Sequence, residues 1–199
     1  MKICVFGDSN ATEQEWFGYE YWGTQLRKYL PEGTCVFNLG ICDETSRDLL
    51  KRLDAECKIR SPDTIIISIG TNDSKLNNKK VETSSEEFET NINKIINICK
   101  NYTNKITFIG LTPVNESKTN PVIWDKHKFF TNNNIKEYNE IIEFGCQNEN
   151  VLFLNVFDTW IKMNYEKLLD KEDGLHLNEM GHNLLFESLK NFLKENEII

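Results

Sequence analysis

The alternation of short apolar runs with helical patterns is the feature that most limits how this chain can fold. Five runs rich in β-branched and apolar residues are separated by longer stretches with apolar residues at helical spacing, which is the pattern of βα units around a parallel sheet. Runs that are apolar throughout indicate strands buried on both faces. The expected strands are residues 3–6, 35–39, 64–69, 106–111 and 151–154.

Amphipathic helices are expected between these strands and at the end of the chain. Their inward-facing residues are Trp22, Leu26 and Tyr29 in 19–30; Leu49, Leu50 and Leu53 in 46–59; Phe88, Ile92, Ile95, Ile96 and Cys99; Ile135, Tyr138, Ile141 and Ile142; and Leu184, Leu185, Ser188, Leu189 and Phe192 in 179–193, with Asn178 as N-cap. The predicted fold class is α/β. It is a three-layer αβα sandwich with a five-stranded parallel sheet in the order 2-1-3-4-5 and right-handed crossovers.

Length and charge limit the organisation and the partners of the chain. The 199 residues contain no repeat or linker, so we expect a single domain over residues 1–199. A formal net charge of −8 argues against general binding of nucleic acid or of an anionic membrane. No apolar run approaches the roughly 20 residues of a membrane span, and the N-terminal run is too short for a signal peptide. Six cysteines without a Cys-x-x-Cys pair indicate reduced packing residues and a cytoplasmic location. The sequence does not indicate an oligomeric state.

Polar motifs follow the first three expected strands. Residues 7–10 (Gly-Asp-Ser-Asn) follow the first, 38–40 (Asn-Leu-Gly) end the second, and 70–73 (Gly-Thr-Asn-Asp) follow the third. In the order 2-1-3-4-5, the second and third strands flank the first at about 4.8 Å each. We therefore expect Gly40 and Asn72 on opposite sides of Ser9.

A fourth motif, residues 173–176 (Asp-Gly-Leu-His), precedes the last helix, which begins at the same edge of the sheet. A serine hydroxyl needs an adjacent base to become a nucleophile. His176 Nε2 would take the proton of Ser9, and Asp173 would accept the Nδ1 proton and stabilise the imidazolium. Three donors would stabilise the charge of a tetrahedral intermediate: the backbone N–H groups of Ser9 and Gly40 and the side-chain amide of Asn72.

These four motifs, with Ser9, Gly40, Asn72 and His176 in this order, resemble the four signature blocks of the SGNH hydrolases, also called GDSL esterases and lipases. The resemblance implies a flavodoxin-like fold and hydrolysis of carboxylic esters, thioesters or acetylated sugars without a metal or another cofactor. It implies Ser9, Asp173 and His176 as triad and Ser9, Gly40 and Asn72 as oxyanion hole. Two features depart from the family: Asn10 stands in place of a leucine, and residues 41–43 (Ile-Cys-Asp) follow Gly40 where small residues are usual.

Several other residues have competing interpretations. Asp8 is expected to accept N–H groups of neighbouring loops, and Trp22 to lie in the core. His182 would pack or face solvent in the last helix. The long connection 112–133 is the expected pocket wall, where Trp124 and His127 are candidate substrate contacts beside a packing alternative. Trp16 and Phe17 are candidates for an acyl pocket, with a core position as the alternative.

The leading functional hypothesis is a metal-independent serine esterase that acts on small or short-acyl esters. Lysophospholipids, acyl thioesters and acetylated carbohydrates remain open as substrates of the same triad. A phosphate-binding or flavin-binding module is an alternative, because residues 9–12 could receive a phosphate at a helix N-terminus, but neither glycine-rich phosphate motif occurs. A phosphohydrolase that holds a metal through Asp8, Asp73, Asp173 and His176 is another, although no pair of histidines has a zinc-site spacing. The last is a non-catalytic binder.

Overall fold

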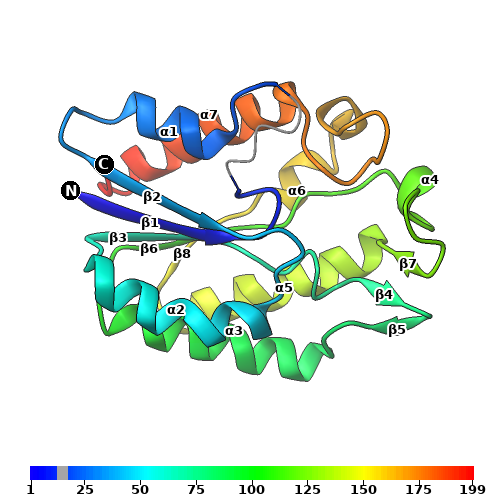
Figure 1. The fold of residues 1–199 in the computed structure, drawn as a ribbon, viewed down its shortest axis with the longest axis horizontal. Coiled ribbons are helices and arrows are strands. Elements are labelled where there is room, and N and C mark those ends of the chain that lie inside the picture. The colour runs from blue at the N-terminus through cyan, green and yellow to red at the C-terminus, as the bar shows by residue number, and fades with distance from the viewer. Residues whose placement is uncertain (13–17) are drawn as a thin grey trace.

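The five short apolar runs form one parallel sheet in the computed structural model, which describes residues 1–12 and 18–199 (Figure 1). The strands are β1 (Lys2–Gly7), β2 (Cys35–Gly40), β3 (Thr64–Ser68), β6 (Ile106–Ile109) and β8 (Leu152–Leu154). Their order in the sheet is β2-β1-β3-β6-β8, and every pair is parallel. The predicted strands and the predicted order 2-1-3-4-5 are confirmed.

Helices cover both faces of this sheet. One face carries α1 (Trp22–Tyr29) and α7 (Glu179–Glu195), and the other carries α2 (Ser46–Arg60), α3 (Ser85–Lys100) and α5 (Asn132–Asn148) (Figure 1). Successive residues of β1 face opposite layers, because side chains alternate along a strand: Ile3 and Val5 pack in the α1 and α7 core, whereas Cys4 and Phe6 pack in the other. The predicted αβα sandwich is confirmed.

A second, smaller sheet was not predicted. It has the order β5-β4-β7 and consists of β4 (Leu76–Asn77), β5 (Lys80–Val81) and β7 (Lys128–Phe129), all antiparallel. Strands of two residues are too short to give a period-2 pattern in the sequence. This sheet joins the loop after β3 to the connection before α5, which also contains the short helix α4 (Glu116–Thr119). The helices α6 (Phe157–Trp160) and η1 (Tyr165–Leu168, a 3-10 helix) lie between β8 and α7.

Helix α7 shows where the sequence interpretation was right and where it was wrong. Asn178 is its N-cap, as predicted: its side chain accepts from the Gly181 N–H at 3.1 Å. Leu185 and Leu189 are fully buried as predicted, and Leu193 continues their stripe. Of the other predicted inward residues, Leu184 is half-buried and packs against the core, whereas Ser188 and Phe192 are only half-buried. In α1, Trp22 and Leu26 are buried as predicted, but Tyr29 is 40% exposed and packs edge-on against Phe186.

Two further observations concern the class of the protein. Across the described residues, the helices are all too short or too polar to pass through a bilayer.

Four cysteines are buried as predicted for packing residues, whereas Cys35 is exposed and Cys42 is half-buried beside the candidate site; the buried ones are Cys4, Cys57, Cys99 and Cys146.

Candidate active site

Ser9 lies in a tight turn at the carboxyl end of the central strand β1. The Asp8 carbonyl accepts hydrogen bonds from the backbone N–H groups of Ala11 (3.0 Å) and Thr12 (3.1 Å), which folds the chain back directly after the strand. The Asp8 N–H donates to Ser68 of β3 at 3.2 Å, so the turn is also fixed to the neighbouring strand. This arrangement holds the Ser9 side chain at the sheet edge, where ligands of parallel sheets bind.

His176 and Asp173 approach Ser9 from the loop before α7. His176 Nε2 lies 2.9 Å from Ser9 Oγ, and His176 Nδ1 lies 2.6 Å from Asp173 Oδ2. The other carboxylate oxygen of Asp173 accepts the N–H groups of Leu175 (2.7 Å) and His176 (3.0 Å), which fixes its orientation. Gly174 has a φ of +65°, and a Cβ there would lie 3.0 Å from the Asn115 side chain, so the turn favours glycine.

The pKa values of this pair shift in opposite directions. Burial acts to lower the pKa of His176, but the hydrogen bond and the negative charge of Asp173 outweigh it and raise that pKa above 6.5. Burial acts to raise the pKa of Asp173, but its hydrogen bond to His176 and the positive charge on the ring lower it below 3.8. Asp173 is thus an anion that accepts a hydrogen bond from His176 Nδ1–H. This keeps the neutral ring in the tautomer with its proton on Nδ1, and Nε2 is left to accept the hydrogen bond of the Ser9 hydroxyl.

Asn72 lies at the same edge, in the turn after β3, and lines the same pocket as Ser9 and His176. Its side-chain nitrogen donates to the Glu44 carbonyl at 3.1 Å. A primary amide has two N–H groups, so the second one is available to a ligand. The prediction that Asn72 and Ser9 share one cleft agrees with this geometry.

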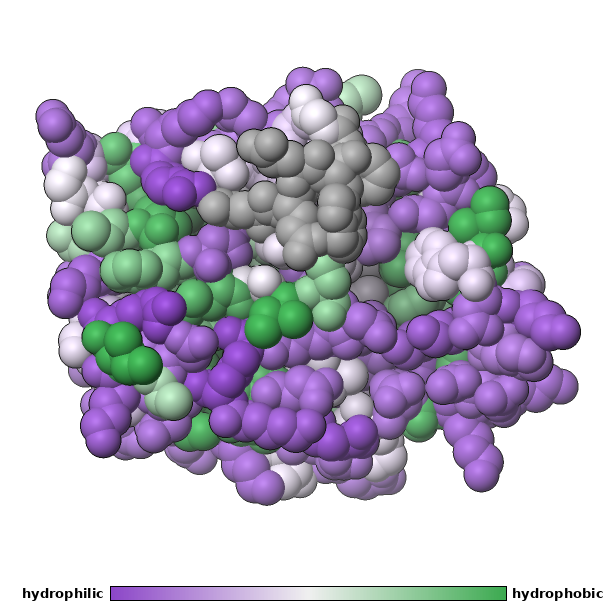
Figure 2. Space-filling view, in the orientation of Figure 1, coloured by the Kyte–Doolittle hydropathy of each residue, from purple (hydrophilic) through white to green (hydrophobic). Residues whose placement is uncertain are grey.

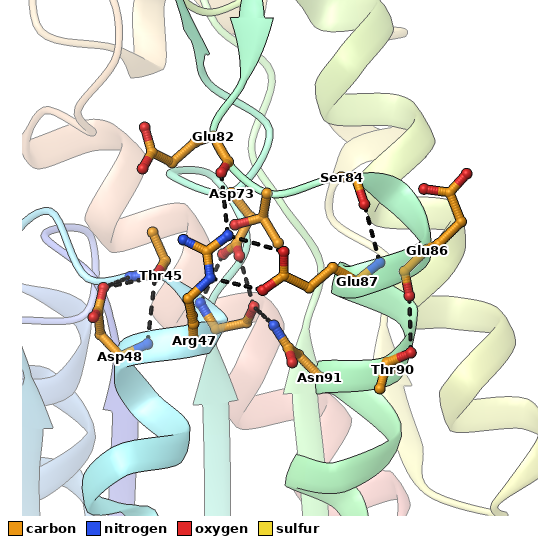
Figure 3. Close-up of polar contacts among 12 residues, drawn as sticks. Thr45, Arg47, Asp48, Asp73, Glu82, Ser84, Glu86, Glu87, Thr90 and Asn91 are labelled. Atoms are coloured by element: carbon orange, nitrogen blue, oxygen red, sulfur yellow. Dashed lines mark hydrogen bonds and ion pairs between the residues drawn. The ribbon is translucent and has the colours of Figure 1, made fainter.

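The neighbouring residue Asp73 anchors the Asn72 turn to the start of α2. Its carboxylate accepts the Ser46 N–H at 2.9 Å and the Ser46 hydroxyl at 2.6 Å, and Asn91 of α3 donates to the same hydroxyl at 3.0 Å. Figure 3 shows Arg47 beside this cluster, where it reaches Glu87 of α3. These contacts join the β3 turn, α2 and α3, so Asn72 has little freedom to move.

Gly40 does not have the contacts that the sequence predicts. Its backbone N–H donates to Asn38 Oδ1 at 3.0 Å, and Gly40 is not among the residues that line the pocket. A Cβ at this position would lie 2.6 Å from Thr12 N and 2.9 Å from Ala11 C. The glycine is therefore needed for close packing beneath the Ser9 turn, and its N–H is already used.

Asp43, three residues after Gly40, lines the pocket that Gly40 does not reach. Its φ is +61°, and its N–H makes no hydrogen bond within residues 1–12 and 18–199. The residue type at position 43 does not indicate such a role, because every residue except proline carries a backbone N–H. The one available signal was the short polar loop between Gly40 and the N-cap of α2, Thr45.

The pocket has a volume of about 300 Å³. It is lined by Ser9, Cys42, Asp43, Asn72, Lys75, Trp124, Lys128, Phe130, Leu175 and His176. Trp124, 51% exposed, stacks on the His176 ring with 6.3 Å between centroids and 30° between planes. The connection 112–133 thus supplies a pocket wall, as predicted. His127 is exposed and does not line the pocket, which differs from its assignment as a substrate contact. Trp16 and Phe17 lie outside the described residues.

Asn10 links the turn of Ser9 to the loop of His176. Its side-chain oxygen accepts the Leu177 N–H at 3.2 Å, and its carbonyl accepts the Trp22 indole N–H at 2.8 Å. Leucine, the residue that Asn10 replaces, has no acceptor for the first contact. The replacement of the family's leucine by Asn10 therefore adds a direct hydrogen bond between the turn of Ser9 and the loop of His176.

Two more buried ionisable groups lie close to the site. Asp8 accepts the N–H of Asn10, within its own turn rather than from a neighbouring loop as predicted, and burial raises its pKa to about 7. His182 is fully buried and packs edge-on against Tyr21 at 4.3 Å between ring centroids. Burial lowers the pKa of His182 to about 3, so this ring is neutral. The packing alternative for His182 is confirmed.

Comparison with known proteins gives one family and one fold. The model of the GDSL-like lipase/acylhydrolase family matches residues 5–184. No curated protein matches the sequence. The lipase/acylhydrolase from Enterococcus faecalis superposes with a TM-score of 0.78 at 21% identity, over 98% of this chain and 96% of that one. Axe2, an acetylxylan esterase from Geobacillus stearothermophilus, gives 0.74 at 18% identity over 96% and 93%. TesA gives 0.74 at 19% identity over 98% and 99%.

Proposed function

We propose that this chain, which belongs to the GDSL-like lipase/acylhydrolase family, is a serine hydrolase that cleaves carboxylic esters through an acyl intermediate on Ser9. One observation carries the proposal: an unbroken line of contacts runs from Asp173 Oδ2 through His176 to Ser9 Oγ, with distances of 2.6 and 2.9 Å. Both distances lie within reach of a hydrogen bond, as proton transfer requires.

In the proposed first step, Ser9 Oγ attacks the ester carbonyl carbon while His176 Nε2 takes the hydroxyl proton. Asp173 stabilises the imidazolium that forms. The negative charge on the former carbonyl oxygen is stabilised by the Ser9 N–H, the free N–H of the Asn72 amide and the Asp43 N–H. The Asp43 N–H takes the role for which the sequence suggested Gly40, because the Gly40 N–H already donates to Asn38.

The intermediate then collapses. The bond between the carbonyl carbon and the alcohol oxygen breaks, and His176 gives its proton to the leaving alcohol, which leaves an acyl group on Ser9. Water attacks the acyl carbon with His176 again as the base, and the second collapse releases the carboxylic acid and restores the Ser9 hydroxyl. No step requires a metal ion, so we propose a metal-independent reaction.

Small or short-acyl esters are the proposed substrates. A pocket of about 300 Å³ is at the small end for ligand sites. The name of Axe2 describes an acetylxylan esterase, and an acetylated carbohydrate remains one candidate here, beside lysophospholipids and acyl thioesters. We also propose that residues 1–199 act as one domain in the cytoplasm, which the buried cysteines of the core support.

Three measurements test the proposed function: ester hydrolysis, covalent labelling and the effect of a chelator. The protein should hydrolyse nitrophenyl acetate, lose activity as the acyl chain lengthens, and become labelled at Ser9 by a fluorophosphonate. EDTA should leave the rate unchanged, whereas a metal-dependent phosphohydrolase would lose its activity and regain it with a divalent ion. Absence of both labelling and ester hydrolysis would rule out the acyl-enzyme proposal.

A further inference from the structure

Two lysines line the pocket beside Ser9 in a chain whose formal net charge is −8. Lys75 comes three residues after Asn72, directly before β4, and Lys128 lies in β7, the strand that pairs with β4. The small second sheet therefore brings both lysines to one wall of the pocket. Figure 2 shows that most of the visible surface on the side drawn is hydrophilic, with apolar residues only in separate groups.

Lys75 is buried but has few partners. Its side chain is 5% exposed, and Nζ lies 2.9 Å from Asp43 Oδ1. This is the one hydrogen bond of the ammonium group within the described ranges 1–12 and 18–199. An ammonium group has three donors, and a buried charge with unused donors is costly unless a ligand or water satisfies them. The Lys75 ammonium thus has donors left for a ligand in the pocket.

The contact with Asp43 does not account for the burial of Lys75. The Asp43 side chain is 67% exposed, and an ion pair with so exposed a partner contributes little to stability. If the ion pair between Lys75 and Asp43 only held the loop of Asp43 in place, a lysine at the surface could make the same contact. The burial of Lys75 inside the pocket is better explained by a ligand that carries negative charge.

Among the side chains that line the pocket, positive charges outnumber negative ones. Lys75 and Lys128 face one carboxylate, that of Asp43, among the lining residues. Lys128 has no ion pair within the part of the chain that the structure describes. Behind the lining, Asp173 holds His176 at 2.6 Å and Glu44 holds Arg52 at 2.5 Å. The buried carboxyl groups of Asp8 and Asp73 accept hydrogen bonds from Asn10 and Ser46.

We propose that the pocket selects esters that carry a fixed negative group, a carboxylate or a phosphate, which Lys75 and Lys128 bind beside the ester bond. The inference depends on the proposed function and specifies its substrate class. When such an ester binds, its carboxylate or phosphate group replaces the exposed Asp43 carboxylate as the partner of Lys75. Charge-assisted hydrogen bonds of this kind favour the charged ester by about tenfold or more in kcat/KM.

The experiment compares charged esters with neutral esters of the same shape. For the acyl side, the pair is 4-nitrophenyl hemisuccinate and its methyl ester. For the alcohol side, the pair is 4-acetoxybenzoate and its methyl ester. The measured quantity is the ratio of kcat/KM for the charged ester to that for the neutral one. In the parent protein we expect this ratio to exceed one for at least one pair and to fall toward one in about 0.5 M NaCl.

Variants assign the effect to particular lysines. Lys75→Met should lower the ratio about tenfold, Lys128→Met should lower it less, and Lys75→Arg should retain part of it. Lys58→Met is the matched control, because Lys58 is exposed near the far end of α2 and its loss makes the same change in net charge. Asp43→Asn should raise the ratio, because it removes the competing carboxylate, and asparagine tolerates a φ of +61°.

The outcomes separate the two proposals. If no ester is hydrolysed, the proposed function fails. If neutral esters are hydrolysed but the ratio in the parent does not exceed one and does not respond to salt, the proposed function stands and the lysine inference is wrong. The salt response of the parent protein decides the question even if Lys75→Met does not fold. A ratio that falls equally in Lys58→Met and Lys75→Met would also overturn the inference.

Discussion

The imidazole Nε2 of His176 lies 2.9 Å from the hydroxyl oxygen of Ser9, although 167 positions separate the two residues in the chain. The fold explains this contact. Ser9 follows the central strand β1, and His176 lies in the loop just before α7, a helix that packs on the same sheet. Both therefore lie at one edge of the sheet without any local sequence relation.

Replacing Ser9 by alanine should lower kcat by several powers of ten, because triad residues act as a unit and the oxyanion donors alone give only weak catalysis. The fold should be retained, since Ser9 is only half-buried and its hydroxyl has His176 as partner. Hydrolysis of nitrophenyl acetate and thermal unfolding check this. Near-parent turnover in the variant would show that another residue is the nucleophile.

Activity should decline at low pH with a midpoint above 6.5. The neutral imidazole is the base, and Asp173 raises the pKa of His176, so lowering the pH through this raised pKa protonates Nε2 and stops proton transfer from Ser9. In Asp173→Asn the two largest raising contributions are lost, while burial and the smaller contributions of Asp8 and Asp170 remain. The midpoint should therefore move to lower pH, and kcat should fall by about 10⁴. A profile of kcat/KM against pH for both proteins is the measurement. An unchanged midpoint in the variant would contradict the pairing.

The sequence was sufficient for the fold and for the prediction that Ser9, His176 and Asp173 lie together, because each depends on residues whose positions the topology determines. Ser9 and Asn72 lie in the turns that follow β1 and β3, and Asp173 lies in the loop before α7; parallel strands end at one edge. The order of the strands then brings these residues together. Asn178 was predictable for a similar reason, since an N-cap depends on the local chain alone.

Other features depend on contacts that residue types do not reveal. A glycine serves either as a donor near a ligand or as a point of close packing, and only the structure shows that Gly40 packs against Thr12 while Asp43 lines the pocket. The second sheet has strands of two residues, without a detectable period. The burial of Lys75 follows from that sheet, so the charge of the pocket wall was not predictable either.

Replacing Asn72 by alanine should lower kcat by about 10² to 10³ and leave KM nearly unchanged, because the amide would donate to an oxyanion that exists only after attack. Loss of its contact with the Glu44 carbonyl should cost only about 1 kcal/mol of stability. Steady-state kinetics with one ester and a denaturant titration separate these two effects. Equal kcat in the variant and the parent would remove Asn72 from the oxyanion hole.

Replacing Gly40 by alanine tests its packing role. A methyl group 2.6 Å from Thr12 N must displace the turn that holds Ser9, so we expect a loss of about 1 to 3 kcal/mol in stability and about 10² in kcat. If Gly40 acted only through its N–H, alanine would keep that group and activity would be retained. Unfolding and kcat measured on the same preparation distinguish the two roles.

Asn10 should act as a positioning residue that orients His176 toward Ser9. Its side-chain oxygen holds the Leu177 N–H at 3.2 Å, one residue beyond the imidazole. In Asn10→Ala this buried N–H loses its partner, which should cost about 1 to 3 kcal/mol of stability. Without this contact, the loop that carries His176 should be more mobile. The imidazole should then lie within reach of Ser9 less often, which should lower kcat with little change in KM.

The matched control for this prediction is Asn139→Ala. Asn139 is also buried and accepts the N–H of Leu111 at 2.9 Å, but this contact holds the chain after β6 rather than the loop of His176. Both variants should lose similar stability, whereas only Asn10→Ala should lose turnover. If the two variants have the same kcat, the contact between Asn10 and Leu177 serves stability alone. If Asn10→Ala instead lowers kcat at an unchanged KM, the residue that departs from the family pattern has a function in aligning the base with the nucleophile.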